Sequence, residues 1–471
     1  MNKRKVISTF LAIFVVFTMI AASGAPVLAQ QGADIQLTDF EDDYSDCPDV
    51  AVDSNNNVHV AFEADDQTVW YTMLDNNGNT LIDDTLIDDG GEEVKPAIGV
   101  DSQDHVHMVW QSESGDYIAY IKLDPYLDDM NGDAATLAAI QLVAATDLYG
   151  DDSQQDPRIA IDSSDDVHVV WTNYDDYEIV YMQLNSGGSV IVPYTVVADT
   201  YSGWQRRPFV AVDSNDDPHI VWNDDMGTDQ DEIFYAMLDG SDGSHLIAAT
   251  LITPDDDLDS KRSDIVVDDE DMVHIFWSDT RDTAYHPEIY YTKLDPSQDD
   301  QDGTPADESA ITVIDDTRLT TNDGESSCAP QAALQCGYIH VTWKDARWDG
   351  DPPEDVFYMV LNTDGNIIVS ETGLTTGSTL GYTHSYADNV IPVAVDSNGK
   401  AHAAWCDGRD GYYEVWYTTY QGPPCGAPPP PVGGEAHLIN KGGLLLPWIA
   451  LLAAVVAGTS LLLVKRRRAQ S

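Results

Sequence analysis

The chain contains little positive charge. Its 471 residues include 82 Asp and Glu but only 22 Lys and Arg. Three of the basic residues lie in the first five positions and five lie at or beyond Lys441, which leaves 14 for residues 33–422. Because 81 of the acids fall in the same segment, its formal net charge is −67. Such a segment repels nucleic acid and argues against a polyanionic partner, so we expect no nucleic-acid partner; solubility in salty surroundings or binding of divalent cations suits it better.

Long apolar runs of helical period are missing between residues 34 and 422, which excludes a helical domain there. The segment instead repeats a short phrase seven times, a histidine followed three positions later by an aromatic residue. Successive histidines lie 48 to 66 residues apart, a period typical of propellers and solenoids. The pairs are His59/Phe62, His107/Trp110, His168/Trp171, His219/Trp222, His274/Trp277, His340/Trp343 and His402/Trp405.

Each repeat predicts four strands. In the first copy, the apolar runs 50–53 and 58–62 flank a Ser/Asn turn, a third run contains the recurrent Tyr71, and a fourth run precedes the next copy. The last copy lacks a fourth run, whereas residues 35–38 stand unassigned before the first. We therefore predict an all-β fold, a seven-bladed β-propeller of four-stranded blades over residues 33–422, closed by the N-terminal strand.

This geometry sorts the loops onto two faces. Turns between the first and second strands of a blade lie on one side, which we call the bottom face. Links between second and third strands, and between successive blades, lie on the other side, the top face. Both the closing strand and the exit of the chain begin at the bottom, so we expect the top face to point away from a membrane.

The recurrent side chains are expected to be packing elements rather than catalytic groups, since every blade carries them. Six copies have an aspartate six positions before the histidine, and this residue is expected to accept backbone hydrogen bonds in the turn. The sixth copy has Leu334 instead. The alternative is a calcium role for the turn residues, with the best candidates Asp53, Asn55 and Asn57 or Asp213, Asn215 and Asp217.

Departures from the repeat are more informative about function. The top-face loops of the last three blades share the pattern Trp-x-Asp-x-Arg, which the first four blades lack. Arginine grips a carboxylate with two parallel hydrogen bonds, so the three loops are candidates for a ligand clamp. The alternative is that each arginine pairs with a nearby aspartate and pins its own loop. The candidate residues are Asp279 and Arg281, Asp345 and Arg347, and Asp407 and Arg409.

Two insertions between third and fourth strands are rich in oxygen ligands around a glycine, as calcium requires. Neither matches the full twelve-position EF-hand pattern, and solvated acidic loops are the alternative. The candidate calcium ligands are Asp128, Asp129, Asn131 and Asp133 in the first insertion and Asp299, Asp300 and Asp302 in the second.

The five cysteines can form disulfides if the chain is exported. Cys336 is expected in the bottom turn of blade 6 and Cys425 where the chain leaves blade 7 at the bottom, so we predict that these two pair. Cys47, Cys328 and Cys406 are expected near the tops of blades 1, 6 and 7, where Cys406 could reach either of the others. A fully reduced set is the alternative.

The two ends of the chain predict a place at the cell surface. Residues 1–29 have the basic start, apolar stretch and small-residue cleavage site of a secretory signal. Residues 423–443 form a Pro-rich stalk, residues 444–464 are an uncharged stretch long enough for a transmembrane helix, and 465–471 form a basic tail expected in the cytoplasm. This layout resembles the membrane anchors of archaeal and bacterial surface proteins.

The phrase Pro-x-Val-Ala-Val-Asp-Ser-Asn with a following Val-His-Val, at residues 48–60, resembles the repeats of extracellular NHL-like and sialidase-like (BNR-type) propellers. The sialidase Asp box is not met, because residues 214–222 lack its glycine and the tryptophan falls one place late. We expect a membrane-anchored, non-enzymatic propeller that binds a glycan or protein through its top face. The alternative is a sialidase-like glycoside hydrolase that uses the arginine cluster with a carboxylate such as Asp345 or Asp407.

Overall fold

The computed structural model describes residues 31–39, 45–64, 67–89, 95–112, 117–150, 153–199, 203–228, 230–283, 285–347, 355–375, 390–409 and 413–426. All of them belong to the first of two compact units, 1–427 and 428–471. The predicted signal 1–29, the transmembrane stretch 444–464, the tail 465–471 and most of the stalk lie outside the described residues. Within the described ranges no helix has the length and apolar character needed to cross a membrane.

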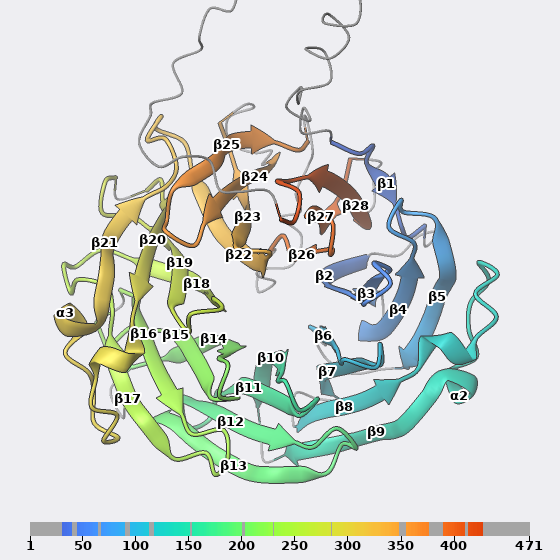
Figure 1. Cartoon of the computed structure of the whole chain (residues 1–471), viewed down its shortest axis with the longest axis horizontal. Coiled ribbons are helices and arrows are strands. Elements are labelled where there is room, and N and C mark those ends of the chain that lie inside the picture. The colour runs from blue at the N-terminus through green and yellow to red at the C-terminus, as the bar shows by residue number, and fades with distance from the viewer. Residues whose placement is uncertain are drawn as a thin grey trace, which may run out of the picture. The chain divides into compact units, whose positions relative to one another are not determined.

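Seven four-stranded antiparallel sheets form a closed ring, so the predicted seven-bladed propeller is confirmed (Figure 1). Blade 1 contains β2 Ser45–Val52, β3 Val58–Ala64, β4 Thr68–Leu74 and β5 Thr80–Asp88; blade 2 contains β6 Ala97–Val100, β7 Val106–Ser112, β8 Tyr117–Leu123 and β9 Gln141–Gly150; blade 3 contains β10 Gln154–Ile161, β11 Val167–Asn173, β12 Glu178–Leu184 and β13 Val190–Asp199. Blade 4 contains β14 Gln205–Val212, β15 Pro218–Asp224, β16 Glu232–Leu238 and β17 His245–Leu251; blade 5 contains β18 Ser260–Val267, β19 Val273–Asp279, β20 Glu288–Leu294 and β21 Thr312–Arg318. Blade 6 contains β22 Ser327–Gln335, β23 Tyr338–Asp345, β24 Asp355–Asn362 and β25 Ile367–Gly373; blade 7 contains β26 Val393–Val395, β27 Lys400–Asp407 and β28 Glu414–Gln421.

The N-terminal strand closes the ring as predicted. Strand β1 (Ile35–Gln36) pairs antiparallel with β28, with Ile35 opposite Tyr417, and so supplies the fourth strand of blade 7. The chain therefore begins and ends its propeller in one sheet, which removes the open edges that an unclosed ring would expose.

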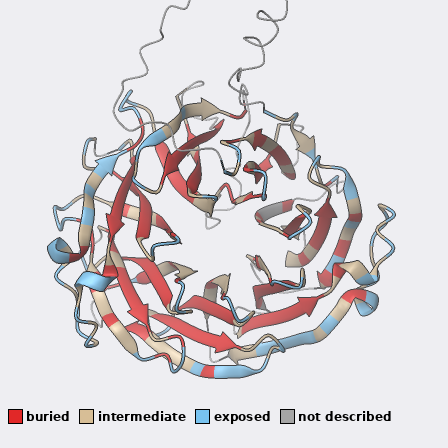
Figure 2. Cartoon of the chain, viewed as in Figure 1, coloured by how far each residue is buried: buried red, intermediate tan, exposed pale blue. Residues whose placement is uncertain are grey.

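The hydrophobic core consists of seven clusters, each shared by two neighbouring blades. Buried residues fill the second and third strands of every blade, and exposure increases toward the outermost strand (Figure 2). The first cluster packs Tyr71 and Met73 of blade 1 against Met108 and Trp110 of blade 2. Each blade thus buries its faces only against its neighbours, as expected from the repeat.

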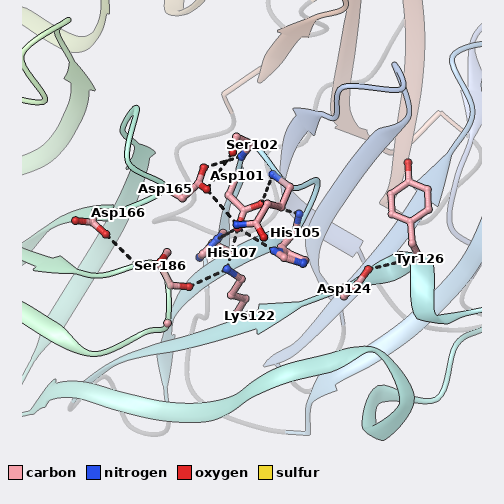
Figure 3. A network of polar contacts seen from close by, with 12 residues as sticks. Asp101, Ser102, His105, His107, Lys122, Asp124, Tyr126, Asp165, Asp166 and Ser186 are labelled. Carbon is pink, nitrogen blue, oxygen red and sulfur yellow. Dashed lines mark hydrogen bonds and ion pairs between the residues drawn. The ribbon is translucent and has the colours of Figure 1, made fainter.

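The recurrent histidine contacts the tyrosine in every blade and lies beside the aspartate in the six blades that carry one. All seven histidines are buried, and Nδ1 of each lies 2.6 to 2.9 Å from the hydroxyl of the blade's tyrosine. In blade 2, Nε2 of His107 lies 3.2 Å from Asp101, which also accepts the backbone N–H groups of residues 103 and 105 (Figure 3). Burial lowers the pKa of His107 despite the hydrogen bond to Asp101. These groups hold the hairpin turn and do not face a ligand.

Neighbouring blades are linked along the bottom face by serine side chains in these turns. Ser102 of blade 2 donates through its N–H and its hydroxyl to Asp165 of blade 3, at 2.8 and 3.0 Å (Figure 3). Asp165 adopts a φ of 62°, a conformation that Asp and Asn tolerate better than other side chains. The same contact recurs as Ser54 to Asp104, Ser214 to Asp271 and Ser397 to Asn56. In blade 3 the N–H of Ser163 and the hydroxyl of Ser164 donate to Asp216.

Blade 6 departs from this pattern. With Leu334 in place of the aspartate, its turn shortens to Cys336 and Gly337, both at positive φ, as a tight two-residue hairpin requires. A disulfide joins Cys336 to Cys425 beyond blade 7, with a Cα–Cα distance of 5.3 Å. These are the two cysteines that the repeat predicts to pair. Cys406 donates to the carbonyl of Ser45 at 3.0 Å, and the side chain of Cys47 lies outside the described part of the chain.

Candidate functional site

A cavity of about 210 Å³ lies at the centre of the ring, lined by residues of all seven innermost strands or of the links that lead into them. Its lining residues lie near the middle of most of these strands, and the links that enter β6 and β26 from the top face complete the wall on that side. The volume greatly exceeds the roughly 10–15 Å³ that a single water needs, so the cavity admits a solute.

A bulge at the start of the innermost strands shapes this cavity. In five blades the pairing of the first and second strands shifts register at this point. Five residues here adopt a positive φ that side chains other than glycine rarely take, and such strained positions cluster at functional sites. They are Lys95, Asp156, Arg207, Arg262 and Ala329.

Four cationic side chains line the cavity: Lys95, Arg158, Arg207 and Arg262, which we call the pocket cations. They come from the consecutive blades 2, 3, 4 and 5. The propeller segment has only 14 basic residues among 81 acids, whereas the cavity wall sets these four cations against three aspartates, Asp49, Asp156 and Asp264, for a formal charge of +1. Focused positive charge in a concave site favours an anionic ligand.

Arg158 is the pocket cation whose surroundings are most open to a ligand. Its guanidinium carbon lies 4.5 Å above the ring centroid of Phe209, and Nη1 donates to the carbonyl of Pro157 at 2.9 Å. No described carboxylate lies within ion-pairing distance of it. An arginine held flat against an aromatic ring keeps its remaining N–H groups directed toward solvent or ligand.

Asp156 forms an ion pair with a second pocket cation, Lys95. The Lys95 ammonium lies 2.7 Å from its carboxylate, and both side chains are nearly buried. The Tyr174 hydroxyl lies 3.5 Å from the other oxygen of Asp156. Burial alone would raise the pKa of Asp156, but Lys95, with weaker help from Arg207 and Arg158, holds it below its ordinary value. Asp156 therefore stays ionised.

Two further aspartates in the cavity wall are bound to backbone. Asp49 accepts from the N–H groups of Val50 and Ile98, and Asp264 accepts from those of Ile265 and Ala332, so each joins its own blade to the next. Burial raises the pKa of Asp264 to about 7 and also raises that of Asp49. Protonation of these two groups would make the cavity more positive.

Neutral polar groups complete the wall. Ser263 is 1% exposed, and its hydroxyl has no hydrogen-bond partner among the residues that the structure describes. Gln331 donates to the carbonyl of Pro330 at 2.8 Å. A buried hydroxyl without a partner is costly and is satisfied if a ligand or water occupies the cavity.

The three arginines of the Trp-x-Asp-x-Arg loops lie elsewhere, and we call them the rim arginines. Each pairs with the aspartate two positions before it and with a second acid in or beside its blade's outermost strand. The structure therefore does not bring them together: it distributes them among three blades, away from the innermost strands. The pairs are Arg281 with Asp279 and Asp316, Arg347 with Asp345 and Glu371, and Arg409 with Asp407 and Asp34.

Aromatic rings also hold the rim arginines. The guanidinium carbons lie 4.4 to 4.6 Å from the ring centroids of Tyr290, Phe357 and Trp416. The neighbouring carboxylates, despite burial, raise the pKa of all three arginines above its ordinary value. This geometry favours the second sequence hypothesis, in which each arginine pins its own loop.

The two acidic insertions brace one blade against the previous one. The first contains the short helices η3 (Pro125–Leu127) and α2 (Leu137–Ile140), and the second contains η4 (Pro296–Gln298) and α3 (Glu308–Ile311). Each makes a parallel bridge to the outermost strand of the preceding blade, β5 or β17. These few helical residues are the departure from the all-β prediction.

The predicted calcium ligands lie in these insertions. Asp128, Asn131, Asp299 and Asp302 accept backbone N–H groups two residues ahead, whereas Asp129, Asp133 and Asp300 are exposed. Across the described ranges, no group of three His, Cys, Asp or Glu side chains is arranged to hold a metal ion. Calcium binding by these loops stays a prediction.

The sequence repeat does not reveal the pocket cations, because the position that three of them share is filled by Asp156 in blade 3 and Ala329 in blade 6. Lys95, Arg207 and Arg262 precede the residue that is usually proline, whereas Arg158 follows it. The available signal was compositional: six of 14 basic residues fall in the same short segment of four consecutive blades, the four pocket cations together with Arg206 and Lys261.

Comparison with known proteins supports the fold. No protein-family model and no curated protein matches the chain. Among solved structures, an ulvan lyase of polysaccharide lyase family 25, bound to -[GlcA(1-4)Rha3S]-, aligns with a TM-score of 0.53 at 8% identity, over 82% of this chain and 95% of its own. The polysaccharide lyase Uly1 aligns with a TM-score of 0.51 at 10% identity, over 79% and 89% of the two chains. At such identities the chain shares the β-propeller fold with these proteins.

Proposed function

We propose that this protein is a propeller that binds an anionic saccharide in its central cavity, without catalysing a reaction on it. The observation that carries the proposal is the convergence of four pocket cations in a domain whose net charge is −67. Charge repulsion opposes such ligands everywhere else on the propeller, so this cavity is where an anionic group gains most from binding.

The chemistry of the cavity suits a carboxylate or sulfate group. Arg158 offers N–H groups that no described carboxylate occupies, and a planar guanidinium matches the geometry of these anions. Ser263 and Gln331 add neutral polar groups that suit sugar hydroxyls. The ulvan lyase that shares this fold is bound to an acidic saccharide, -[GlcA(1-4)Rha3S]-, and this supports the proposal.

A second candidate function is hydrolysis of an acidic sugar. Three arginines, Arg158, Arg207 and Arg262, line one cavity, and Tyr174 contacts Asp156 in its wall. The sialidase resemblance implies an arginine triad with a tyrosine nucleophile and an acid. Against this function, burial and the Asp156 charge raise the pKa of Tyr174 well above its ordinary value, which keeps its hydroxyl protonated. A fluorogenic sialoside assay with Tyr174→Phe as control tests this reaction. Turnover by the wild type that Tyr174→Phe lacks would show that the protein hydrolyses the sugar instead of only binding it.

We propose a place outside the cell, with the propeller tethered by the stretch 444–464. The signal-like residues 1–29 support export, and a disulfide between Cys336 and Cys425 suits an oxidising compartment. Protease treatment of intact cells, followed by detection of the propeller, tests this location.

The test of binding uses a matched pair of arginine variants. In titration calorimetry with an ulvan-derived tetrasaccharide, Arg158→Gln should weaken binding by about 10- to 100-fold, as expected for the loss of a charged hydrogen bond. Arg281→Gln removes an arginine that its own blade already pairs, so affinity should be unchanged. A neutral tetrasaccharide should not bind. Equal binding by wild type and Arg158→Gln, or loss of binding only in Arg281→Gln, would overturn the proposal.

A further inference from the structure

Two exposed aromatic rings stack on each other on the top face. Tyr177 and Trp204 have ring centroids 5.4 Å apart and planes inclined by only 17°. Trp204 is 50% exposed and Tyr177 is 37% exposed, although most tryptophans of the repeat are fully buried. An exposed aromatic pair of this size is unusual on so acidic a surface and marks an interaction site.

The pair is connected to the cavity by two short segments. Tyr177 lies in the link between β11 and β12, and Tyr174 of the same link contacts Asp156 in the cavity wall. Trp204 lies in the link from blade 3 to blade 4, three residues before Arg207 of the cavity. Three residues of chain span at most about 11 Å, so the rings lie within reach of one short oligosaccharide that enters the cavity.

The backbone holds the rings in place. The Trp204 N–H donates to Asp225 at 2.9 Å, and a Cβ added to the preceding Gly203 would lie 2.8 Å from the Met226 nitrogen. Gly203 thus packs tightly on blade 4. Tyr177 adopts a φ of 56°, a strained conformation for a bulky residue. Strain and close packing that fix two exposed rings argue for a preformed surface.

We infer that Tyr177 and Trp204 form a sugar-stacking subsite, so that the ligand is an acidic oligosaccharide of several units rather than a single sugar. One anionic unit lies among the pocket cations, and the apolar C–H face of a neighbouring pyranose ring packs on the exposed aromatic surface. This inference rests on the proposed function, because it extends the same binding site outward from the cavity.

The test measures binding of the ulvan-derived tetrasaccharide to the full-length chain at low and high salt. Trp204→Ala should weaken binding about tenfold at both, since an apolar contact is not screened. Trp204→Phe should restore most of the affinity. Arg158→Gln should instead weaken binding and reduce its dependence on salt. Tyr285→Ala is the matched control, because Tyr285 is 89% exposed in a top-face loop of blade 5 and stacks on no described ring; it should bind as wild type.

The outcomes separate the two proposals. If Arg158→Gln weakens binding and Trp204→Ala binds as wild type, the cavity binds the ligand and the stacking subsite is wrong. If wild type binds no tetrasaccharide, or Arg158→Gln has no effect, the proposed function fails first. An unchanged melting temperature of Trp204→Ala supports a binding role, whereas a large drop in it would show that the ring pair only fastens the two links.

Discussion

The pocket cations and the rim arginines use the same residue type in opposite ways. Each rim arginine meets two carboxylates and an aromatic ring of its own blade or its closing segment, so its charge is neutralised where it lies. Arg158 in the cavity also has its ring, Phe209, but no described carboxylate within ion-pairing distance. The comparison teaches that partners, rather than residue type or loop pattern, separate an arginine that stabilises a blade from one that is available to a ligand.

The largest expected effect concerns two buried glutamates of the blades, Glu232 and Glu288, and the dependence of stability on pH. Glu232 and Glu288 are buried at blade junctions, where Thr253 and Thr320 donate to them, and burial raises the pKa of each to about 7. The folded state then holds protons that the unfolded chain has already lost. Stability should therefore be greatest near pH 5 and fall as pH rises through 7, by several kcal/mol in total at about 1.4 kcal/mol per pKa unit. Thermal melts from pH 5 to pH 8 measure this trend.

Two variants sharpen the trend. Glu288→Gln should raise the melting temperature at pH 8 and flatten the pH dependence, whereas the exposed Glu270→Gln should change neither.

In the cavity, protonation of Asp264 should tighten binding of the anionic tetrasaccharide as pH falls through about 7, and Asp264→Asn should remove that dependence. A melting temperature that climbs steadily from pH 5 to pH 8 would contradict the assignment of raised pKa values.

Arg347→Ala should cost about 3 kcal/mol of unfolding free energy, because it leaves the buried Asp345 and the partly buried Glu371 without their cation. Binding of the tetrasaccharide should not change. Chemical denaturation gives the first quantity and calorimetry the second. Arg318→Ala is the control, since its pair with Asp282 is exposed and should contribute less than about 1 kcal/mol. If Arg347→Ala weakens binding while remaining stable, the distinction between the two sets of arginines is lost.

The smallest effect should come from Lys95→Met, because Lys95 is the pocket cation that most resembles a rim arginine. Its loss leaves Asp156 with only the weaker influence of Arg207 and Arg158, so stability at neutral pH should fall by about 1–2 kcal/mol. A double-mutant cycle with Asp156→Asn measures the coupling of the pair. Additive single effects would show that the contact contributes nothing to stability and that Lys95 resembles Arg158, which has no described carboxylate within ion-pairing distance.

Most of the fold could be predicted because repetition multiplies the signal. The phrase around His59 and its six copies fixes the number of blades, and the missing fourth strand after Tyr417 indicates where residues 35–38 must pair. The same map brings Cys336 and Cys425 to one face, although they lie 89 residues apart. The roles of the histidine and tyrosine in packing also follow from their presence in every blade.

The cavity could not be predicted in the same way. Its residues vary from blade to blade, so the repeat hides them, and they converge only when the ring closes. The bulge that displaces Arg207 and Arg262 depends on a positive φ, and an arginine in a sequence does not indicate that conformation. The Trp-x-Asp-x-Arg loops depart from the first four blades but recur in the last three, and this shared pattern reflects a structural role, in which each arginine fastens its own loop.

The disulfide of blade 6 has a mechanical consequence. Strands β26, β27 and β28 all lie between Cys336 and Cys425 in the sequence. A pull on the chain beyond Cys425 is therefore transmitted through the sulfur atoms to the β22–β23 turn, and β26, β27 and β28 carry none of the tension. With that bond reduced, the same force would peel β28 away from β1 first. Stretching single molecules with and without a reductant would show the ring opening at a higher force when the disulfide is intact.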